Sequence, residues 1–239
     1  MRKDAWLYRL LTRVAPATAW KRTLKPAGLY LVSRHVAPLS TFYGVDRGTP
    51  VDRFYIERFL EANRQAIRGR CLEIKDAAYT RRFGGTRVSA SDVLDIDPQM
   101  PEATMRGDLR RLDNVAADRY DCIILTQVLQ FIDECESAVR ECRRILKPGG
   151  VLLATVPSMG RIDPRPGVEK DFWRFTKAGA RHLFHKVFEP VDVEVEAHGN
   201  CRVGLAFWVG MSSEELTEAE RQFTDPDFPL IVTIRAVKG

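Results

Sequence analysis

Short apolar runs recur along the chain from residue 71 onward and are separated by segments with helical periodicity. The runs are CLEI (71–74), RVSASDVL (87–94), ATMRGDL (103–109), DCIILTQ (121–127) and VLLATVP (151–157). Apolar and β-branched residues in runs this short are typical of strands that are buried on both faces. Strands that alternate with helices predict a largely parallel sheet wrapped by helices, which is the α/β class of fold.

Three segments carry the helical period. They are residues 56–67, 134–147 and 175–188. Thr176 is the expected N-cap of the third helix, because a hydroxyl at that position accepts a hydrogen bond from a free amide of the first turn. KPGG (147–150) is expected to end the second helix, since proline and glycine follow a lysine in its last turn.

The last part of the chain reads as two strands with an apolar segment between them. VDVEVEAHG (191–199) and LIVTIRAV (230–237) alternate strictly, which predicts strands with one more exposed side. GLAFWVGM (204–211) is expected at the surface, where it either covers an acceptor pocket or forms a subunit contact in a homo-oligomer. We therefore expect residues 46–239 to form one α/β domain.

The first forty residues differ from the rest of the chain in charge. They contain eight Lys and Arg residues and one acidic residue, whereas the whole chain carries a net charge of +5. The nearly neutral remainder argues against a nucleic-acid-binding domain, which needs a cationic surface. Apolar residues from Trp6 to Val14 share one helical face, so residues 1–45 are expected to form a basic helical extension. It either caps the domain or makes a weak membrane-surface contact through residues 1–40.

The composition excludes several other classes. The hydrophobic fraction is 45%, and no apolar run reaches the roughly 18 residues that a membrane-spanning helix needs. Five cysteines lie scattered without a C-x-x-C pair, which indicates reduced thiols and no zinc site. The start of the chain lacks the pattern of a secretory signal. The expectation is therefore a cytoplasmic protein without a metal.

Polar residues that follow the expected strands form the candidate site, because ligands bind beyond the carboxyl ends of the strands in open α/β sheets. These residues are Lys75, Asp76 and Tyr79 after the first strand, Asp92 after the second, Asp108 and Leu109 after the third, and Thr126 and Gln127 after the fourth. A carboxylate after the second strand suits a ribose diol, since it accepts two hydrogen bonds. Asp92, Asp95 and Asp97 are all available for this role, and we favour Asp92 because it directly follows VSAS.

Five segments, in their order and spacing, resemble class I S-adenosylmethionine-dependent methyltransferases. They are LEI (72–74), the acid near the end of the second strand, GDL (107–109), YDCIILTQVLQFI (120–132) and ILKPGGVLLATVP (145–157). The chain is most similar to the small-molecule, methyltransferase type 11-like proteins often found near sugar and polysaccharide biosynthesis functions. The resemblance covers roughly residues 50–239. It implies a Rossmann-like, doubly wound sheet of seven strands whose last strand is antiparallel.

The resemblance also implies S-adenosyl-L-methionine as the cofactor and a role for each matching residue. Glu73 matches the acid that orders the loop around the methionine end of the cofactor, and Asp92 matches the ribose-binding acid. Asp108 and Leu109 match the adenine-contacting pair. Thr126 and Gln127 lie where the fourth strand reaches the sulfonium and the substrate.

The first turn departs from the family pattern, because KDAAYT (75–80) has no glycine to adopt the backbone angles that other residues avoid. A turn that is built differently places Asp76 against the cofactor's ammonium and Arg81 or Arg82 against its carboxylate, with Lys75 in water. Without such a turn, the chain is a catalytically inactive or repurposed methyltransferase-fold protein that acts as a binding partner in a biosynthetic complex. A dinucleotide oxidoreductase fits poorly, since no G-x-G-x-x-G follows the first strand.

DFWRFT (171–176) is the candidate acceptor-binding segment. Trp173 suits stacking on a sugar face and Arg174 suits a phosphate or carboxylate; alternatively, Trp173 and Phe175 anchor the helix that follows. The weak candidates for a catalytic base are His185, Asp171 and Tyr43, and His182 and His198 are further candidates on the substrate side. The sequence as a whole predicts methyl transfer to a small-molecule or sugar/glycan hydroxyl.

Overall fold

The computed structural model describes residues 36–97, 99–163 and 170–239. These residues form two compact units. The smaller contains residues up to Phe54 together with Gly199–Phe228, and the larger contains Tyr55–His198 with Pro229–Gly239. This division differs from the expected boundary at residue 45, because an insertion before the last strand joins the smaller unit. The expected helix over Trp6–Val14 and its membrane contact lie outside the described residues.

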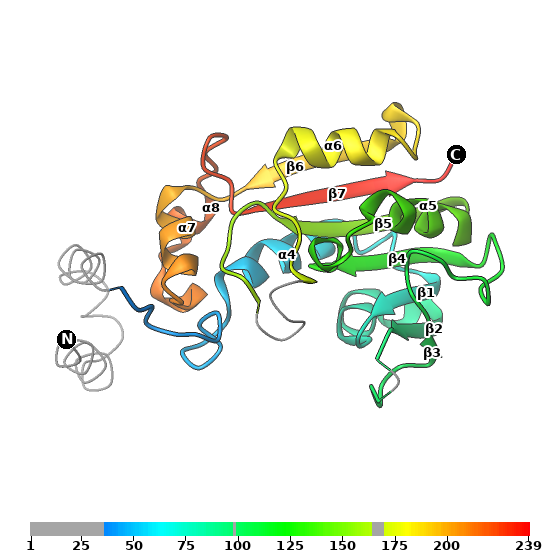
Figure 1. Cartoon of the computed structure of the whole chain (residues 1–239), viewed down its shortest axis with the longest axis horizontal. Helices are drawn as coiled ribbons and strands as arrows, with labels where there is room; N and C mark the ends of the chain where they lie inside the picture. Colours follow the sequence, from blue (N-terminus) through cyan, green and yellow to red (C-terminus); the bar gives the residue numbers. More distant parts are fainter. Residues whose placement is uncertain (1–35, 98, 164–169) are drawn as a thin grey trace. The chain divides into compact units, whose positions relative to one another are not determined.

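The larger unit is built on a seven-stranded sheet whose strand order is β3-β2-β1-β4-β5-β7-β6 (Figure 1). The strands are β1 (Gly69–Ile74), β2 (Val88–Asp95), β3 (Met105–Arg106), β4 (Tyr120–Thr126), β5 (Leu146–Pro157), β6 (Val193–His198) and β7 (Ile231–Val237). All neighbours pair in parallel except β7, which is antiparallel to both β5 and β6. The predicted fold is confirmed, including the antiparallel last strand.

Three helices form near the periodic segments, although the first begins and ends five residues earlier than the expected 56–67. They are α4 (Val51–Ala62), α5 (Cys135–Ile145) and α6 (Lys177–His185). Thr176 is the N-cap of α6, and its side chain accepts a hydrogen bond from the amide of Gly179. The apolar sides of α5 and α6 form one core with alternate residues of the strands, including Leu125 and Leu152. The opposite alternation leaves Glu73 and Thr233 on the other face of the sheet.

KPGG does not end the second helix as expected. Helix α5 stops at Ile145, and KPGG forms the first part of β5. Gly149 has a φ of 76°, and its amide donates to the carbonyl of Lys238 at 2.6 Å, so the turn is tied into the sheet. The expected strand over residues 103–109 is also shorter, since β3 contains two residues.

The smaller unit contains two short helices, α7 (Cys201–Trp208) and α8 (Glu218–Gln222). Asn200 caps α7 by accepting from the amide of Val203, and its amide group donates to the carbonyls of Glu220 and Phe223. The expected surface segment 204–211 contributes most of α7. Phe207 is buried, whereas Leu205 and Trp208 are exposed.

Candidate functional site

The carboxyl ends of the parallel strands share one edge of the sheet, which we call the carboxyl edge. β1, β2, β4 and β5 end there at Ile74, Asp95, Thr126 and Pro157, and β6 ends there at His198. Figure 1 shows β6 and β7 pointing in opposite directions, so the end of β7 lies at the other edge, the amino edge. The candidate residues are therefore divided between two opposite edges of the sheet.

Lys75 adopts a backbone conformation that favours glycine, with a φ of 77°. Its amide donates to the carbonyl of Leu94 at 3.0 Å, which holds the turn against the end of β2. The side chain is exposed, as the expectation of a lysine in water requires. Left-handed backbone costs a non-glycine residue roughly 1–2 kcal/mol, and strain of this kind is concentrated at functional sites. The glycine-type turn is therefore retained without glycine.

Glu73 orders the segment that follows this turn. Its carboxylate is 3% exposed and accepts from the amides of Tyr79 at 3.1 Å and Thr80 at 2.8 Å. Burial raises the pKa of Glu73, opposed by the hydrogen bonds from Thr80 and Tyr79. Two otherwise free amides of the helical turn that starts at Thr80 are satisfied in this way. This is the loop-ordering position that the resemblance implies for Glu73.

The remaining residues of the first turn divide between surface and core. Asp76 is half-buried, and one of its carboxylate oxygens accepts from the amide of Ala78 at 2.8 Å. Tyr79 is buried, and its ring lies 5.9 Å from the ring of Phe83. Arg81 and Arg82 are exposed and pair with Glu102 and Glu57. The turn thus presents Asp76 and main-chain groups, while Tyr79 packs inside.

A second left-handed residue, Gln127, follows β4 with a φ of 55°. Its amide donates to the carbonyl of Thr155 at 2.9 Å, and its own carbonyl accepts from the side chain of Gln130 at 3.0 Å. Gln130 is buried, and its side-chain oxygen has no donor among the residues that the structure describes. Strands β1 and β4 are neighbours. Two strained turns therefore lie side by side at the carboxyl edge, and no sequence pattern had singled out Gln130.

The prediction that Asp92 directly follows a strand is wrong. Strand β2 continues to Asp95, so Asp92 lies inside it, opposite Leu72. Its side chain is 15% exposed and accepts from Arg70 at 2.9 Å and from the Tyr120 hydroxyl at 2.9 Å. Burial acts to raise the pKa of Asp92, but the hydrogen bonds from Arg70 and Tyr120 outweigh it and the pKa is lowered. Asp92 therefore ties three strands together.

Asp95 is the carboxylate at the end of β2. It pairs in register with Arg106 of β3 and is half-buried. One oxygen accepts from the amide of Asp97 at 2.8 Å, and the other oxygen has no donor within the described residues. Because Lys75 bonds to Leu94, Asp95 lies directly beside the first turn. Of the three aspartates considered for a ribose diol, Asp95 alone ends its strand at this edge.

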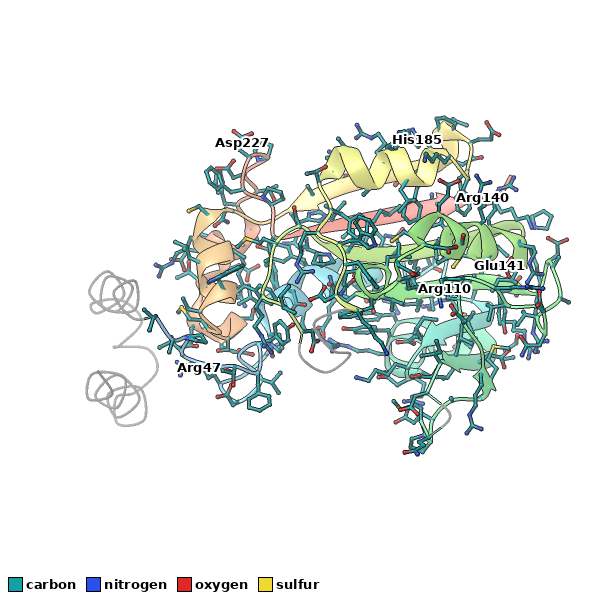
Figure 2. The ribbon with its side chains drawn as sticks, viewed as in Figure 1. Arg47, Arg110, Arg140, Glu141, His185 and Asp227 are labelled. Carbon is teal, nitrogen blue, oxygen red and sulfur yellow. The ribbon has the colours of Figure 1, made fainter. Side chains whose placement is uncertain are left out.

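Asp108 is held by a neighbouring arginine. Arg110 donates to both carboxylate oxygens, at 3.0–3.1 Å from Nε and 2.6 Å from Nη2, and also pairs with Asp133 at 2.7 Å. These hydrogen bonds lower the pKa of Asp108. Leu109 is buried in the main core. An adenine amine bound at Asp108 would therefore share the Asp108 carboxylate with Arg110, which is labelled in Figure 2.

Residues 170–176 form an ordered segment beside Gln130. The amide of Phe172 donates to the Gln130 carbonyl at 2.8 Å, and the Trp173 indole donates to the Ile132 carbonyl at 2.9 Å. Arg174 pairs with Asp171 through both oxygens and donates to the carbonyl of Arg161 at 2.7 Å. Trp173 is 43% exposed, so it does not anchor α6 in the core. Phe175 is partly buried and packs against the hydrophobic core.

The three base candidates do not come together. The pKa of Asp171 is lowered by its hydrogen bonds from Arg174, which makes it a weak base. His185 is in the last turn of α6, and Figure 2 shows it on the same side as Arg140 and Glu141, away from the carboxyl edge. Tyr43 belongs to the smaller unit, where its ring stacks on Phe207 at 5.6 Å. His185 is thus placed at the wrong end of its helix.

His198 is the histidine at the carboxyl edge. It ends β6, its Nε2 lies 2.9 Å from the Thr233 hydroxyl, and its ring stacks on Tyr55 at 6.1 Å. Burial lowers its pKa, Glu196 acts to raise it, and Arg58 and Lys177 act to lower it further. His198 is therefore neutral near pH 7. The sequence makes His198 one of several candidates for a base and does not single it out.

The structure contains no cluster of three or more potential metal ligands in the part of the chain that it describes. Over the same residues, no helix is long and apolar enough to cross a membrane.

A family model described as a methyltransferase domain matches residues 76–154, from the first turn into β5. No curated protein matches the sequence. A SAM-dependent methyltransferase from Archaeoglobus fulgidus has 15% identity and a TM-score of 0.56, over 82% of this chain and 98% of that chain. One from Mesorhizobium loti has 15% identity and a TM-score of 0.53, over 78% and 99%.

Phosphoethanolamine N-methyltransferase 2 from Haemonchus contortus, in complex with S-adenosyl-L-methionine, has 12% identity and a TM-score of 0.50. The alignment covers 94% of this chain and 60% of that chain. The strand order and these similarities define the fold as that of class I S-adenosylmethionine-dependent methyltransferases. The methyltransferase-domain model matches residues 76–154, about a third of the chain, and this match agrees with the resemblance of the sequence.

Proposed function

We propose that the protein binds S-adenosyl-L-methionine at the carboxyl edge and transfers its methyl group to a hydroxyl of a small molecule or glycan. The observation that carries this proposal is the first turn. Lys75 accepts the strained glycine conformation, and Glu73 secures the amides that follow. A chain that no longer bound the cofactor would gain stability by relaxing such a turn, because strain persists where surrounding structure or function requires it.

Residues along the edge fit the parts of the cofactor. Asp95 offers an open carboxylate oxygen for the ribose diol beside the first turn. Asp76 faces the methionine end as a partner for the ammonium, with the second oxygen of its half-buried carboxylate. Asp108, set by Arg110, lies on the adenine side together with the main chain of Leu109. Assigning the ribose to Asp95 instead of Asp92 follows from where β2 ends.

The acceptor side is assigned to the segment beyond β4 and β5. Thr126 ends β4 and Gln127 follows it, and the exposed Trp173 is held a few residues further on by hydrogen bonds to the carbonyls of Gln130 and Ile132. When bound, the cofactor supplies an electrophilic methyl group, and the protein aligns the acceptor oxygen with it. His198, neutral and oriented by Thr233, is our candidate for removing the acceptor proton in place of His185.

Equilibrium binding tests the cofactor assignment. We expect calorimetric titration of the wild-type protein with S-adenosyl-L-methionine and S-adenosylhomocysteine to show saturable binding. The Asp95→Asn variant should bind about 10- to 100-fold more weakly, because a charged hydrogen bond contributes about 1.5–3 kcal/mol. Asp92→Asn is the matched control and should keep the wild-type affinity, since its carboxylate is used by Arg70 and Tyr120.

Two results contradict the assignment. Absence of heat and of thermal stabilisation at millimolar ligand favours the non-catalytic, repurposed interpretation. A loss of affinity in Asp92→Asn but not in Asp95→Asn returns the ribose role to Asp92. Once binding is established, transfer of an isotopically labelled methyl group to a panel of hydroxyl compounds, read by mass spectrometry, identifies the acceptor class.

A further inference from the structure

An open cavity lies at the amino edge of the larger unit. It has a volume of about 390 Å³ and is lined by Arg140, Arg143 and Arg144 of α5, by Glu141, by Val187 after α6 and by Lys238 after β7. Figure 2 shows Arg140 and Glu141 on α5 near the carboxyl-terminal end of β7. Strand β4 has seven residues, so at about 3.3 Å per residue this cavity is about 20 Å from the carboxyl edge.

The lining is cationic, with four basic side chains and one carboxylate. The guanidinium of Arg144 is already bound within the protein, because it pairs with Glu141 at 2.8 Å and donates to the carbonyls of Val115 and Leu112. Lys238 pairs with Asp118 at 2.7 Å and donates to the carbonyl of Leu146 at 2.8 Å. These bonds fix the walls, and Lys238 also offsets the negative end of α5.

Of the cations that line this cavity, Arg143 is the one that makes no hydrogen bond or ion pair with the residues that the structure describes. Its Nε is buried and has no hydrogen-bond acceptor among the described residues, and no ion pair of its guanidinium is present there. A buried N–H without an acceptor costs about 1–3 kcal/mol, more when it is charged. Arg140 is three residues earlier on the same helix face, and its one ion pair within the described residues is with Glu136 at the surface. Exposed pairs of this kind contribute about 0.3–0.5 kcal/mol. Arg140 can therefore turn to a ligand at little cost.

We infer that this cavity is a second ligand site that binds a phosphorylated small molecule, with the phosphate on Arg143 and Arg140. Guanidinium groups match phosphate oxygens in pairs, which a single lysine does not. The volume lies within the range of about 300–1,000 Å³ for small-molecule sites. Val187 supplies an apolar wall for the part of the ligand that carries no charge. The inference does not depend on the proposed methyl transfer, because the two sites are on opposite edges.

Titration with glucose 6-phosphate at fixed ionic strength tests the site. We expect saturable binding by calorimetry and a shift of the Arg143 Nε–H resonance in ¹⁵N-labelled wild-type protein. The Arg143→Gln variant should bind at least ten-fold more weakly. Arg181→Gln removes the same charge from an exposed position on α6 that does not line the cavity, and it should bind like the wild type.

Several outcomes overturn the inference. The first is absence of saturable binding to the wild-type protein up to about 20 mM glucose 6-phosphate, where even a Kd of about 1 mM would give near-complete binding. The others are an unshifted Arg143 resonance and an equal loss of affinity in both variants. The resonance shift is read in wild-type protein, so it decides the question even if Arg143→Gln does not fold. Binding that survives in Arg143→Gln and responds to S-adenosyl-L-methionine as a competitor assigns the phosphate to the carboxyl edge instead and equally contradicts the second site.

Discussion

At the scale of single residues, the site depends on backbone conformations that the sequence does not reveal. The sequence located the turn after β1, because an apolar strand followed by polar residues is a pattern of neighbouring positions, and the resemblance pointed to Glu73, whose carboxylate accepts from the amides of Tyr79 and Thr80. It did not reveal that Lys75 and Gln127 adopt a positive φ, since both residue types ordinarily avoid that region. The missing glycines therefore suggested a missing turn, whereas the turn is present and strained.

Replacing Lys75 with glycine should stabilise the protein. Glycine removes a left-handed penalty of roughly 1–2 kcal/mol and loses part of that gain, about 0.4–1 kcal/mol, to the greater freedom of the unfolded chain. We expect a net increase in the free energy of unfolding of about 0.5–1 kcal/mol by urea denaturation. Lys75→Ala is the control and should change stability little, because alanine keeps the strain. A Lys75→Gly variant no more stable than Lys75→Ala would show that the turn is not strained.

At the scale of elements, periodicity predicted the strands and the helices α4, α5 and α6 with errors at their ends, and it missed α7 and α8. The sequence analysis placed Asp92 directly after VSAS, whereas β2 includes Asp92 and ends at Asp95. For this reason we propose Asp95 instead of Asp92 for the ribose. Element ends are decided by contacts from distant segments. Here Arg70 on β1 and Tyr120 on β4 donate hydrogen bonds to Asp92 inside β2. No pattern in the sequence around Asp92 predicts these contacts.

The Asp92 network should make stability depend on pH in a defined direction. The pKa of Asp92 is lowered in the folded protein, so its contribution is present above the unfolded value of about 3.9 and is lost as pH falls through the folded value. We expect Asp92→Asn to reduce the free energy of unfolding at pH 7 by about 1–3 kcal/mol. The difference from wild type should shrink on acidification below about pH 4.

A surface ion pair provides the control for this measurement. Asp113 pairs with Arg111, and both side chains are largely exposed, so Asp113→Asn should cost less than about 1 kcal/mol. Urea denaturation of both variants between neutral and acidic pH makes the comparison. If the difference in the free energy of unfolding between wild type and Asp92→Asn stays constant down to the lowest pH, then protonation of Asp92 does not contribute to the loss of stability in acid.

At the scale of the whole molecule, the sequence predicted one domain after residue 45, whereas the described residues form two compact units. The reason is that residues 199–228 are an insertion between β6 and β7, and their grouping with residues before 55 arises from contacts across more than 140 positions, such as the pair of Arg47 and Glu215 at 2.5 Å. Periodicity cannot detect pairing at such a separation. The class of the fold was nonetheless legible, because strand and helix alternate.

The five thiols provide a test of the whole structure. Cys71, Cys122, Cys135 and Cys142 are buried in the sheet and α5, and Cys201 on α7 is exposed. Burial raises the pKa of Cys135 and of Cys142 to about 12, so these thiols resist forming thiolates. We expect a disulfide reagent to modify one thiol rapidly in the native protein and five after denaturation, read by absorbance. Rapid reaction of two or more native thiols would contradict the core described here.

The single accessible thiol has a practical consequence. Cys201 belongs to the smaller unit, whereas the first turn and the amino-edge cavity both belong to the larger one. A maleimide dye would attach to α7 without any engineering, and a second dye introduced near either edge would complete an energy-transfer pair. Ligand titrations followed by such a pair would measure, in solution, whether filling one pocket draws the two halves of the protein together.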